Sequence, residues 1–494
     1  MSDALTAQSD DRALLDRPSV RALLDQVANS VRVGSDLRVE ISDEAALRES
    51  GIEHLARAAA LDADEDARDS ARWIIGEVGQ QLGIRPASIH DLYIARGRGE
   101  ISGFTVPAMN IRAASYDSGR ALFAAARELR VGALICEIAR SEIGYTAQRP
   151  AEYVAVLTAA AIREGWSGPL FIQGDHFQIN AKKHATDPTG ETRAVRDLIR
   201  EAIHAGFYNI DVDTSTLVDL AKDGLDAQQK VNYALSAELT ALIRRLEPEG
   251  VTVSVGGEIG EVGTENSTAE ELRAYMDGFQ RELARQSGKA GRELAGLSKI
   301  SVQSGTTHGG VVLADGSIAD VAIDFDTLRR LSTIAREEYG LSGAVQHGAS
   351  TLPAEAFVTF AEVETAEIHL ATGFQNLLFD HPSLPAELCA RMYEHCRTDM
   401  AGEAKEGETD EQFIYKTRKK SLGAFKQELW DLPAEVREAI RGSLQEQFSF
   451  LFRTLAVADT QEMVRRFVAP PETRRSGPGA LRIKAAADDW DLSD

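Results

Sequence analysis

Three histidines stand where short apolar runs of the sequence end, and together they could hold a metal ion. His176, His308 and His347 each close such a run and lie near a glycine, in a chain with only ten histidines. One histidine in such a place would be explained by a hydrogen bond in the core. Three at equivalent positions favour one shared site, because imidazoles with an open coordination position suit catalytic Zn2+. Co2+ or Fe2+ can use similar ligands.

Two carboxylates accompany the histidines. Glu258 follows an apolar run and two glycines, which let backbone or substrate approach closely. It is a candidate fourth ligand, a partner that orients a ligand, or a structural carboxylate in a salt bridge. Asp175 directly precedes His176, and a carboxylate beside a bound cation is a candidate acid/base. Its alternative role is structural, since adjacent side chains on a strand normally point to opposite faces.

The elements that must position these residues are eight short apolar or β-branched runs, which alternate with longer amphipathic segments. The runs span residues 104–111, 133–139, 169–174, 209–213, 251–255, 299–304, 343–346 and 366–371. This alternation, without a Rossmann glycine fingerprint after the first run, predicts an α/β fold, a (β/α)8 TIM barrel over residues 89–384. The carboxyl ends of barrel strands meet at one face. We therefore expect the polar residues that end the runs to share one site.

Helical extensions are expected on both sides of the barrel. Residues 1–88 and 385–468 place apolar residues at helical spacing, which predicts a helical N-terminal extension and a C-terminal helical segment. Residues 469–494 contain several prolines and glycines, which predict a flexible tail. The amphipathic helices predict packing on the barrel or on a second copy, so a homo-oligomer is expected.

Composition narrows the classes of partner. The net charge of −23 opposes binding to nucleic acid or to an anionic membrane surface, although a local basic pocket could still capture a small anion. Cys136, Cys389 and Cys396 show neither a disulfide framework nor zinc-knuckle spacing. The N-terminus lacks the pattern of a signal peptide, and no apolar run approaches the length of a membrane span. These features predict a soluble cytoplasmic protein.

Four ordered motifs resemble those of the class II, metal-dependent fructose-bisphosphate aldolases. They are similar to the family's Asp-His, Glu-(Leu/Ile)-Gly, Gly-Thr-x-His-Gly and His-Gly-(Gly/Ala)-Ser motifs, and they lie at residues 174–176, 257–260, 305–309 and 347–350. Residues 202–215 also resemble the family's helix and fourth strand. The likeness covers roughly residues 100 to 380 in the right order.

The resemblance implies an aldehyde-lyase that reversibly cleaves a ketose (bis)phosphate or a related sugar through a metal-stabilised enediolate. It implies that His176, His308 and His347 hold a divalent metal, with Zn2+ the first expectation, and that Glu258 is an additional or alternative ligand. It also implies that Asp175 handles a proton on the oxygen of the aldehyde half.

Further roles follow from the same resemblance. Glu265, in the loop after the glutamate motif, is the nearest match to the family's second proton shuttle. Asn110 and Ser141 match positions near the polar atoms of the substrate. The positions implied for phosphate binding are Gly309, Gly348, Ser350 and Thr372, although the glycines could instead serve tight turns.

The eighth run departs from the family pattern. Class II aldolases read approximately Lys-x-Asn-x-(Asp/Ala)-Thr-(Asp/Glu) there, whereas this chain reads Glu-Ile-His-Leu-Ala-Thr-Gly over residues 367–373. His369 stands where a substrate-positioning amide is expected, so the substrate is predicted to be a sugar phosphate or ketose related to the family's usual one.

A basic segment and two competing functions complete the sequence hypotheses. Residues 415–426 are basic in an acidic chain, so Arg418 or Lys419 could bind a distal anion of the substrate, and the alternative is a solvated helix face. The competing functions are a noncatalytic accessory subunit and another metal-dependent lyase or isomerase on the same barrel.

Overall fold

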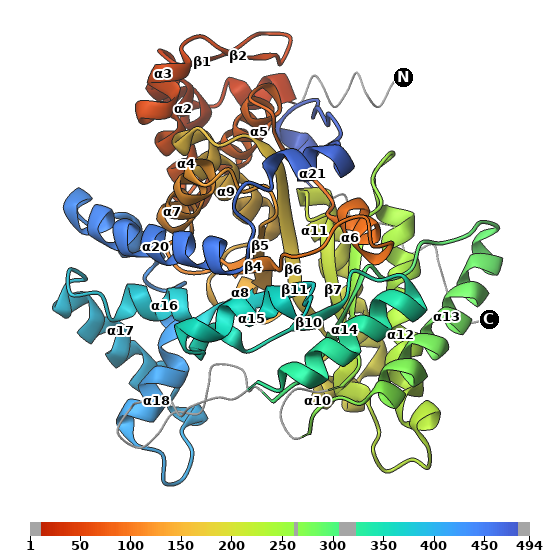
Figure 1. The fold of residues 1–494 in the computed structure, drawn as a ribbon. Helices are drawn as coiled ribbons and strands as arrows, with labels where there is room; N and C mark the ends of the chain where they lie inside the picture. Colours follow the sequence, from red (N-terminus) through yellow and green to blue (C-terminus); the bar gives the residue numbers. More distant parts are fainter. Residues whose placement is uncertain (1–10, 261–264, 306–322, 483–494) are drawn as a thin grey trace.

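A closed barrel of eight parallel strands forms the centre of the protein (Figure 1). The structure is a computed structural model that describes residues 11–260, 265–305 and 323–482. The barrel strands are β4 (Val106–Asn110), β5 (Ile135–Ala139), β6 (Gly168–Gln178), β7 (Asn209–Asp213), β8 (Ser254–Glu258), β9 (Lys299–Val302), β10 (Ala344–Gln346) and β11 (Glu367–Leu370). Each pairs with its neighbour in chain order, β11 pairs with β4, and β6 pairs with β7, which closes the ring. The predicted (β/α)8 barrel is confirmed.

Helices surround the barrel and alternate with its strands. They are α7 (Ser115–Glu128), α8 (Arg140–Tyr145), α9 (Pro150–Glu164), α10 (Ala181–Thr186), α11 (Pro188–Ala205), α12 (Leu225–Leu246), α13 (Ala269–Ala290), α14 (Phe325–Tyr339), α15 (Phe357–Glu362) and α16 (Thr372–Phe379). Helix α9 shows how the sequence sets such bounds. Pro150 occupies its first turn, where no backbone donor is needed, and Gly165 ends it in a left-handed conformation (φ +70°).

Strand β6 contains a bulge that re-aims its last side chains. Gly174 pairs with Ile210 and Phe177 with Val212, so β6 has one more residue than β7 between the two pairs. His176 has φ +40° within this bulge. Gly174 is required here, because a Cβ on it would lie 2.4 Å from the ring of Phe177. The bulge breaks the alternation of side chains, and it explains how Asp175 and His176 can both face one cavity.

The barrel interior is polar on one set of alternating positions. Glu137 (β5), Gln173 (β6), Asp211 (β7), Lys299 (β9) and Glu367 (β11) are buried there and contact one another. Branched aliphatic residues usually fill these layers in TIM barrels. The alternate residues, such as Ile210 and Ile300, are apolar, as expected for side chains that pack on the surrounding helices.

The N-terminal extension is mainly helical. It contains α2 (Pro18–Val27), the antiparallel pair β1 (Val31–Val33) and β2 (Val39–Ile41), α3 (Glu44–Ala46), η1 (Leu47–Gly51), α4 (Ile52–Leu61) and α5 (Glu65–Gln81). Next come β3 (Ile84–Pro86), which pairs with the start of β6, and α6 (His90–Gly97). Helices α4 and α5 pack on α9 of the barrel (Figure 1). The short strands were not predicted, because three-residue strands carry little periodicity.

The C-terminal segment is also helical and packs on the barrel. It contains α17 (Ala386–Asp399), α18 (Asp410–Thr417), η6 (Arg418–Ser421), α19 (Lys426–Trp430), α20 (Ala434–Thr454), α21 (Gln461–Phe467) and η7 (Pro478–Leu481). Beyond α21 the chain returns to the N-terminal helices, where Nε of Arg482 lies 2.9 Å from Asp69 of α5. The rest of the predicted flexible tail lies outside the described residues, and the domain divisions at residues 88, 384 and 468 remain predictions. In the described part of the chain, no helix is long and apolar enough to cross a membrane.

A buried charge cluster joins α20 to barrel helix α7. Asp117 of α7 accepts hydrogen bonds from Arg437 and Arg441 of α20, both at 2.7 Å. Because Asp117 is buried, its removal would leave two largely buried guanidinium groups without this partner. We expect Asp117→Ala to lower the free energy of unfolding by about 3 kcal/mol in urea denaturation. Glu435→Gln, on the exposed side of α20, is the matched control, and an equal loss in both variants would contradict this role for the cluster.

Candidate metal centre and ligand cavity

A cavity of about 570 Å3 opens at the carboxyl ends of the barrel strands. It is lined by nine of the residues that the sequence predicts for the site: Asn110, Ser141, Asp175, His176, His347, Gly348, Ser350, His369 and Thr372. These residues come from the ends of β4, β5, β6, β10 and β11 or from the segments that follow them. The barrel therefore brings together residues that lie up to 262 positions apart in the chain.

His176, Glu258 and His347 form the group that best fits a metal ion. One ligand atom from each lies within 4.8 Å of the others. Nδ1 of His176 is 3.5 Å from Oε2 of Glu258 and 3.0 Å from Oδ2 of Asp213. The ring of His347 lies 4.4 Å from that of His176, centroid to centroid. Two imidazoles and a carboxylate form a donor set typical of zinc and of other first-row divalent metals.

The electrostatics of this group favour a cation. Burial alone would lower the pKa of His176, but Asp175, Asp213 and Glu258 raise it well above its ordinary value. Burial, followed by the nearby charge of Asp213, raises the pKa of Glu258 well above its ordinary value. These carboxylates thus lie close together with little solvent, and a positive charge between them relieves their repulsion, whether from a proton or from a metal ion.

His369 lies deeper, between the metal group and the polar interior. Its ring is 4.0 Å from that of His347, centroid to centroid. Its Nδ1 lies 2.9 Å from Glu137, and its Nε2 lies 2.8 Å from Glu367. Burial would lower the pKa of His369, but Glu137 and Asp175 raise it well above its ordinary value. The carboxyl groups beside both nitrogens favour the protonated form of this ring, which contributes to the cavity wall.

The polar interior supports His369 from below. Nζ of Lys299 lies 2.5 Å from Glu367 and 2.9 Å from Asp211, and it donates to Gln173 at 2.8 Å. Tyr93, from α6, donates a hydrogen bond to the other oxygen of Glu367. Burial opposes ionisation of Glu367, but Lys299 and His369 lower its pKa to about 2. Glu367 is therefore a carboxylate anion held between two cations.

Two further groups of side chains also bring ligand atoms within 4.8 Å of one another. They are Asp175, His347 and His369, and Glu137, Glu367 and His369. The second group already has a cation, because Lys299 contacts Glu367. The first shares His347 with the preferred group, so it offers a neighbouring position for the same ion.

Cationic and polar side chains also line the cavity. Arg112 forms a buried ion pair with Glu142, which also accepts a hydrogen bond from Asn110 at 2.6 Å. Lys419 lines the cavity, and its Nζ has no ion-pair or hydrogen-bond partner among the described residues. Burial, followed by the charge of Arg112, lowers the pKa of Lys419. Arg418 faces away and pairs with Asp380 at 2.5 Å. The basic segment thus delivers one of its two candidate residues to the cavity.

Small groups line the side of the cavity formed after β10 and β11. Gly348 has φ +72°, a left-handed conformation that glycine adopts without strain. Oγ of Ser350 accepts a hydrogen bond from the backbone N–H of Ala371 at 2.7 Å. Thr372 is the first residue of α16. Backbone N–H groups and hydroxyls in such a place can receive an anion.

The remaining predicted residues lie elsewhere or outside the description. Glu265 is exposed and is not among the residues that line the cavity. His308 and Gly309 lie outside the described residues. Asp213, Lys299 and Glu367 were missed as members of the site, although the alternation in Asn-Ile-Asp-Val-Asp (209–213) could have revealed inward-facing carboxylates.

Comparison with known proteins gives one family. The sequence model of the family of class II fructose-bisphosphate aldolases matches residues 98–424 of this chain. Solved structures with a similar fold include the fructose-bisphosphate aldolase of Campylobacter jejuni (14% identity, 76% of this chain and 98% of that one, TM-score 0.43) and the YdjI aldolase of Escherichia coli K12 (14%, 71% and 99%, 0.39). Another is the fructuronate-tagaturonate epimerase UxaE of Cohnella laeviribosi (12%, 78% and 86%, 0.50).

The search of curated proteins gave no match. The family match spans well over half of the chain and includes the strands that carry Asp175, His176, Glu258 and His347. The protein belongs to the class II fructose-bisphosphate aldolase family.

Proposed function

We propose that the protein is a metal-dependent aldolase that reversibly cleaves a phosphorylated ketose or a related sugar. The observation that carries the proposal is the convergence of Asp175, His176 and His347 on one cavity, with Glu258 beside His176 and with Arg112 and Lys419 also in the cavity lining. Its substrate would enter at the carboxyl end of the barrel, where the cavity lies.

His176, Glu258 and His347 would hold the metal, with His308 as the further ligand that the family motif supplies. A divalent ion, with Zn2+ the first choice, would stabilise the negative charge that develops on oxygen when a carbon–carbon bond beside a carbonyl breaks. Nδ1 of His176 would donate to Asp213, which fixes the orientation of the ring and leaves Nε2 for the metal. Ser301 does the same for His347, with its Oγ 3.1 Å from Nε2.

Proton transfer would fall to two carboxylates. Asp175 lies beside the metal group, and its carboxylate would take the proton from the hydroxyl of the aldehyde half during cleavage and return it during condensation. Glu265 would exchange the other proton with the carbon of the ketone half. Glu265 is exposed and does not line the cavity, so this role requires its carboxylate to move toward the cavity when substrate binds.

Recognition of the substrate would be divided between two sides of the cavity. Gly348, Ser350 and Thr372 would receive one phosphate. Asn110 and Ser141 would contact the hydroxyl groups between that phosphate and the far end of the substrate. His369 stands where the family pattern has a neutral amide, and its ring would favour a substrate whose oxygen at this position carries negative charge or accepts a hydrogen bond.

The proposal is tested by a retro-aldol assay that measures aldehyde release from a panel of ketose phosphates, ketoses and ketonic acids. We expect cleavage that a chelator abolishes and that added Zn2+ or Co2+ restores. Conversion of one ketose into its epimer without aldehyde release would instead indicate an isomerase on the same barrel. A folded protein without metal and without activity would indicate the accessory role.

We also propose that the protein is a cytoplasmic homo-oligomer. Sedimentation analysis would test the oligomeric state.

Lys419 provides a separate prediction about substrate binding. Its unpaired ammonium group lines the cavity, so it is expected to contact the anionic end of the substrate distant from the metal. We expect Lys419→Met to raise KM for a phosphorylated substrate about tenfold with little change in kcat, because this contact is uniform through the reaction. The matched control is Lys420→Met, since Lys420 pairs with Glu403. Equal KM values for both variants would contradict the assignment.

A further inference from the structure

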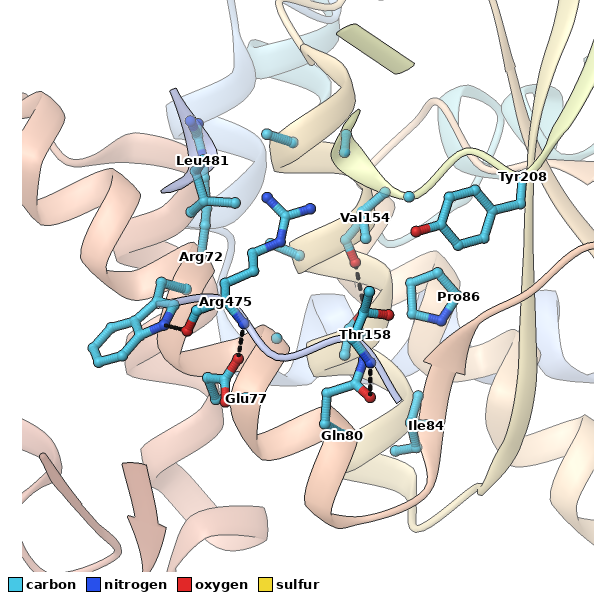
Figure 2. A pocket seen from close by; sticks show the side chains of 17 residues that line it. Arg72, Glu77, Gln80, Ile84, Pro86, Val154, Thr158, Tyr208, Arg475 and Leu481 are labelled. Atoms are coloured by element: carbon cyan, nitrogen blue, oxygen red, sulfur yellow. Dashed lines mark hydrogen bonds between the residues drawn. The ribbon is translucent and has the colours of Figure 1, made fainter. Parts of the chain in front are cut away.

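A second cavity lies beside the amino ends of the barrel strands, away from the metal group. It has a volume of about 80 Å3 and lies between α5, α9, β3 and the C-terminal segment around residues 473–481 (Figure 2). Ile84 and Pro86 line it from β3, which pairs with the first residues of β6. Tyr208 lines it from the residue just before β7. The proposed aldolase chemistry does not use this cavity.

Arg475 is the residue in this cavity that most needs a partner. Its backbone is fixed on α5, because its N–H donates to Glu77 at 2.9 Å and its carbonyl accepts from the indole of Trp73 at 3.2 Å. Nη2 donates to the carbonyl of His204 at 2.5 Å. Nη1 is buried and has no hydrogen-bond partner among the described residues. A charged donor in such a place is costly unless something accepts its hydrogen bond.

The guanidinium of Arg475 also lacks an ion pair among the described residues. The other guanidinium of the cavity, that of Arg72, lies 3.6 Å from Asp69 and 3.8 Å from Glu152. For Arg475, in the part of the chain that the structure describes, no carboxylate lies within ion-pair distance. Burial lowers the pKa of Arg475, whereas Tyr208 and Glu77, which also line the cavity, raise it. The cavity therefore contains one guanidinium without an ion pair, together with the carboxylate of Glu77, which accepts the backbone N–H of Arg475.

The rest of the wall is mostly apolar. Trp73, Ile84, Pro86 and Val154 line it together with small residues of α9 and α11. Figure 2 shows the guanidinium of Arg475 and the phenol of Tyr208 approaching from the two sides of Val154. Inorganic phosphate would leave these apolar side chains without contact, whereas a ligand with an apolar body and one anionic group would satisfy both parts of the wall.

We propose that this cavity binds a small organic carboxylate, whose anionic group pairs with Nη1 of Arg475 and whose apolar part contacts Trp73, Ile84 and Val154. Arg–carboxylate pairs are among the stronger charge-assisted hydrogen bonds. The ligand would join the C-terminal segment to α5 and α9. Its binding is therefore coupled to the attachment of that segment, and it stabilises the folded protein by an amount that grows with the logarithm of its concentration above Kd.

The proposal is tested by titrating the protein with isobutyrate and measuring both the heat of binding and the melting temperature. The neutral isostere isobutyramide and inorganic phosphate serve as comparison ligands. We expect isobutyrate to give a saturable binding isotherm and a rise in Tm, and to bind at least about tenfold more tightly than either comparison ligand. Arg475→Gln should lose that preference, whereas Arg474→Gln, which alters the exposed neighbouring residue, should keep it.

Several results would overturn the proposal. The first is a lack of saturable isobutyrate binding to the unaltered protein. The second is equal binding of isobutyrate and isobutyramide, which is expected of a cavity that holds only water. The third is undiminished isobutyrate binding by R475Q. Preference for phosphate over isobutyrate would overturn the class of ligand. If R475Q does not fold, the comparison of isobutyrate with isobutyramide on the unaltered protein still decides.

Discussion

Replacement of His347 by alanine is expected to remove the metal and with it the activity. His347 is buried, belongs to the preferred metal group and also contacts the ring of His369. Loss of one imidazole leaves His176 and Glu258 as the described members of the group. Because a bound metal contributes several kcal/mol to the stabilisation of developing charge, we expect kcat/KM for ketose cleavage to fall about 10^3-fold or more. Elemental analysis should show the bound metal falling toward zero.

The control for this variant is another histidine outside the cavity. His381 lies near Ser443, with Nε2 3.2 Å from its hydroxyl, and His381→Ala should retain both metal and activity. The sharpest contradiction would be an H347A protein that holds one metal per chain. That result would show that the ion lies elsewhere, for example in the group formed by Glu137, Glu367 and His369.

The sequence predicted the barrel well because each strand carried its own signal. The eight predicted runs all became strands, and the largest difference is at the end of β6, which continues to Gln178 rather than ending at Gly174. The polar residues at the end of each run marked the carboxyl ends of the strands, and nine of the predicted site residues do line one cavity. The order of the motifs along the chain was enough for this prediction, without knowledge of which strands are neighbours.

The bulge in β6 could not be predicted from the sequence. Its cause is tertiary, since it depends on the register between β6 and β7 and on the space that Phe177 takes beside Gly174. Without the bulge, Asp175 and His176 would point to opposite faces of the strand. The sequence therefore identified both residues but could not show how both reach the cavity.

The charged interior was also missed, for a different reason. Lys299 and Glu367 are the first residues of their strands. In a sequence, a charged residue at such a place is easily assigned to the preceding loop. Their burial depends on closure of the barrel, which places five charged or amide side chains from different strands in one layer. Only the inward direction of alternate residues, combined with closure, shows that these groups must pair with one another.

Replacement of Lys299 by methionine is expected to give the largest loss of stability. Lys299 is buried and lies between Asp211 and Glu367, and methionine has a similar length but no charge. Removing one partner leaves two buried carboxylates without this counter-charge, which typically costs about 3–5 kcal/mol in the free energy of unfolding. Urea denaturation at neutral pH would measure the loss.

The pH dependence of this loss has a definite sign. In the unaltered protein the pKa of Glu367 is lowered to about 2, so its ionic contribution to stability is present above the pKa of an unfolded glutamate and is lost as the pH falls toward 2. Without Lys299 the pKa of Glu367 should rise, because burial then acts with less opposition. The K299M deficit should therefore be largest near neutral pH and shrink as the solution becomes acidic.

A double variant separates the loss of charge from the loss of packing. Glu367→Gln removes one of the two carboxylates that Lys299 neutralises, so the combination K299M/E367Q should be more stable than K299M alone, although Asp211 still lacks its cation. If the two proteins are equally stable and the K299M deficit does not change with pH, the ion pair is not what stabilises the barrel interior.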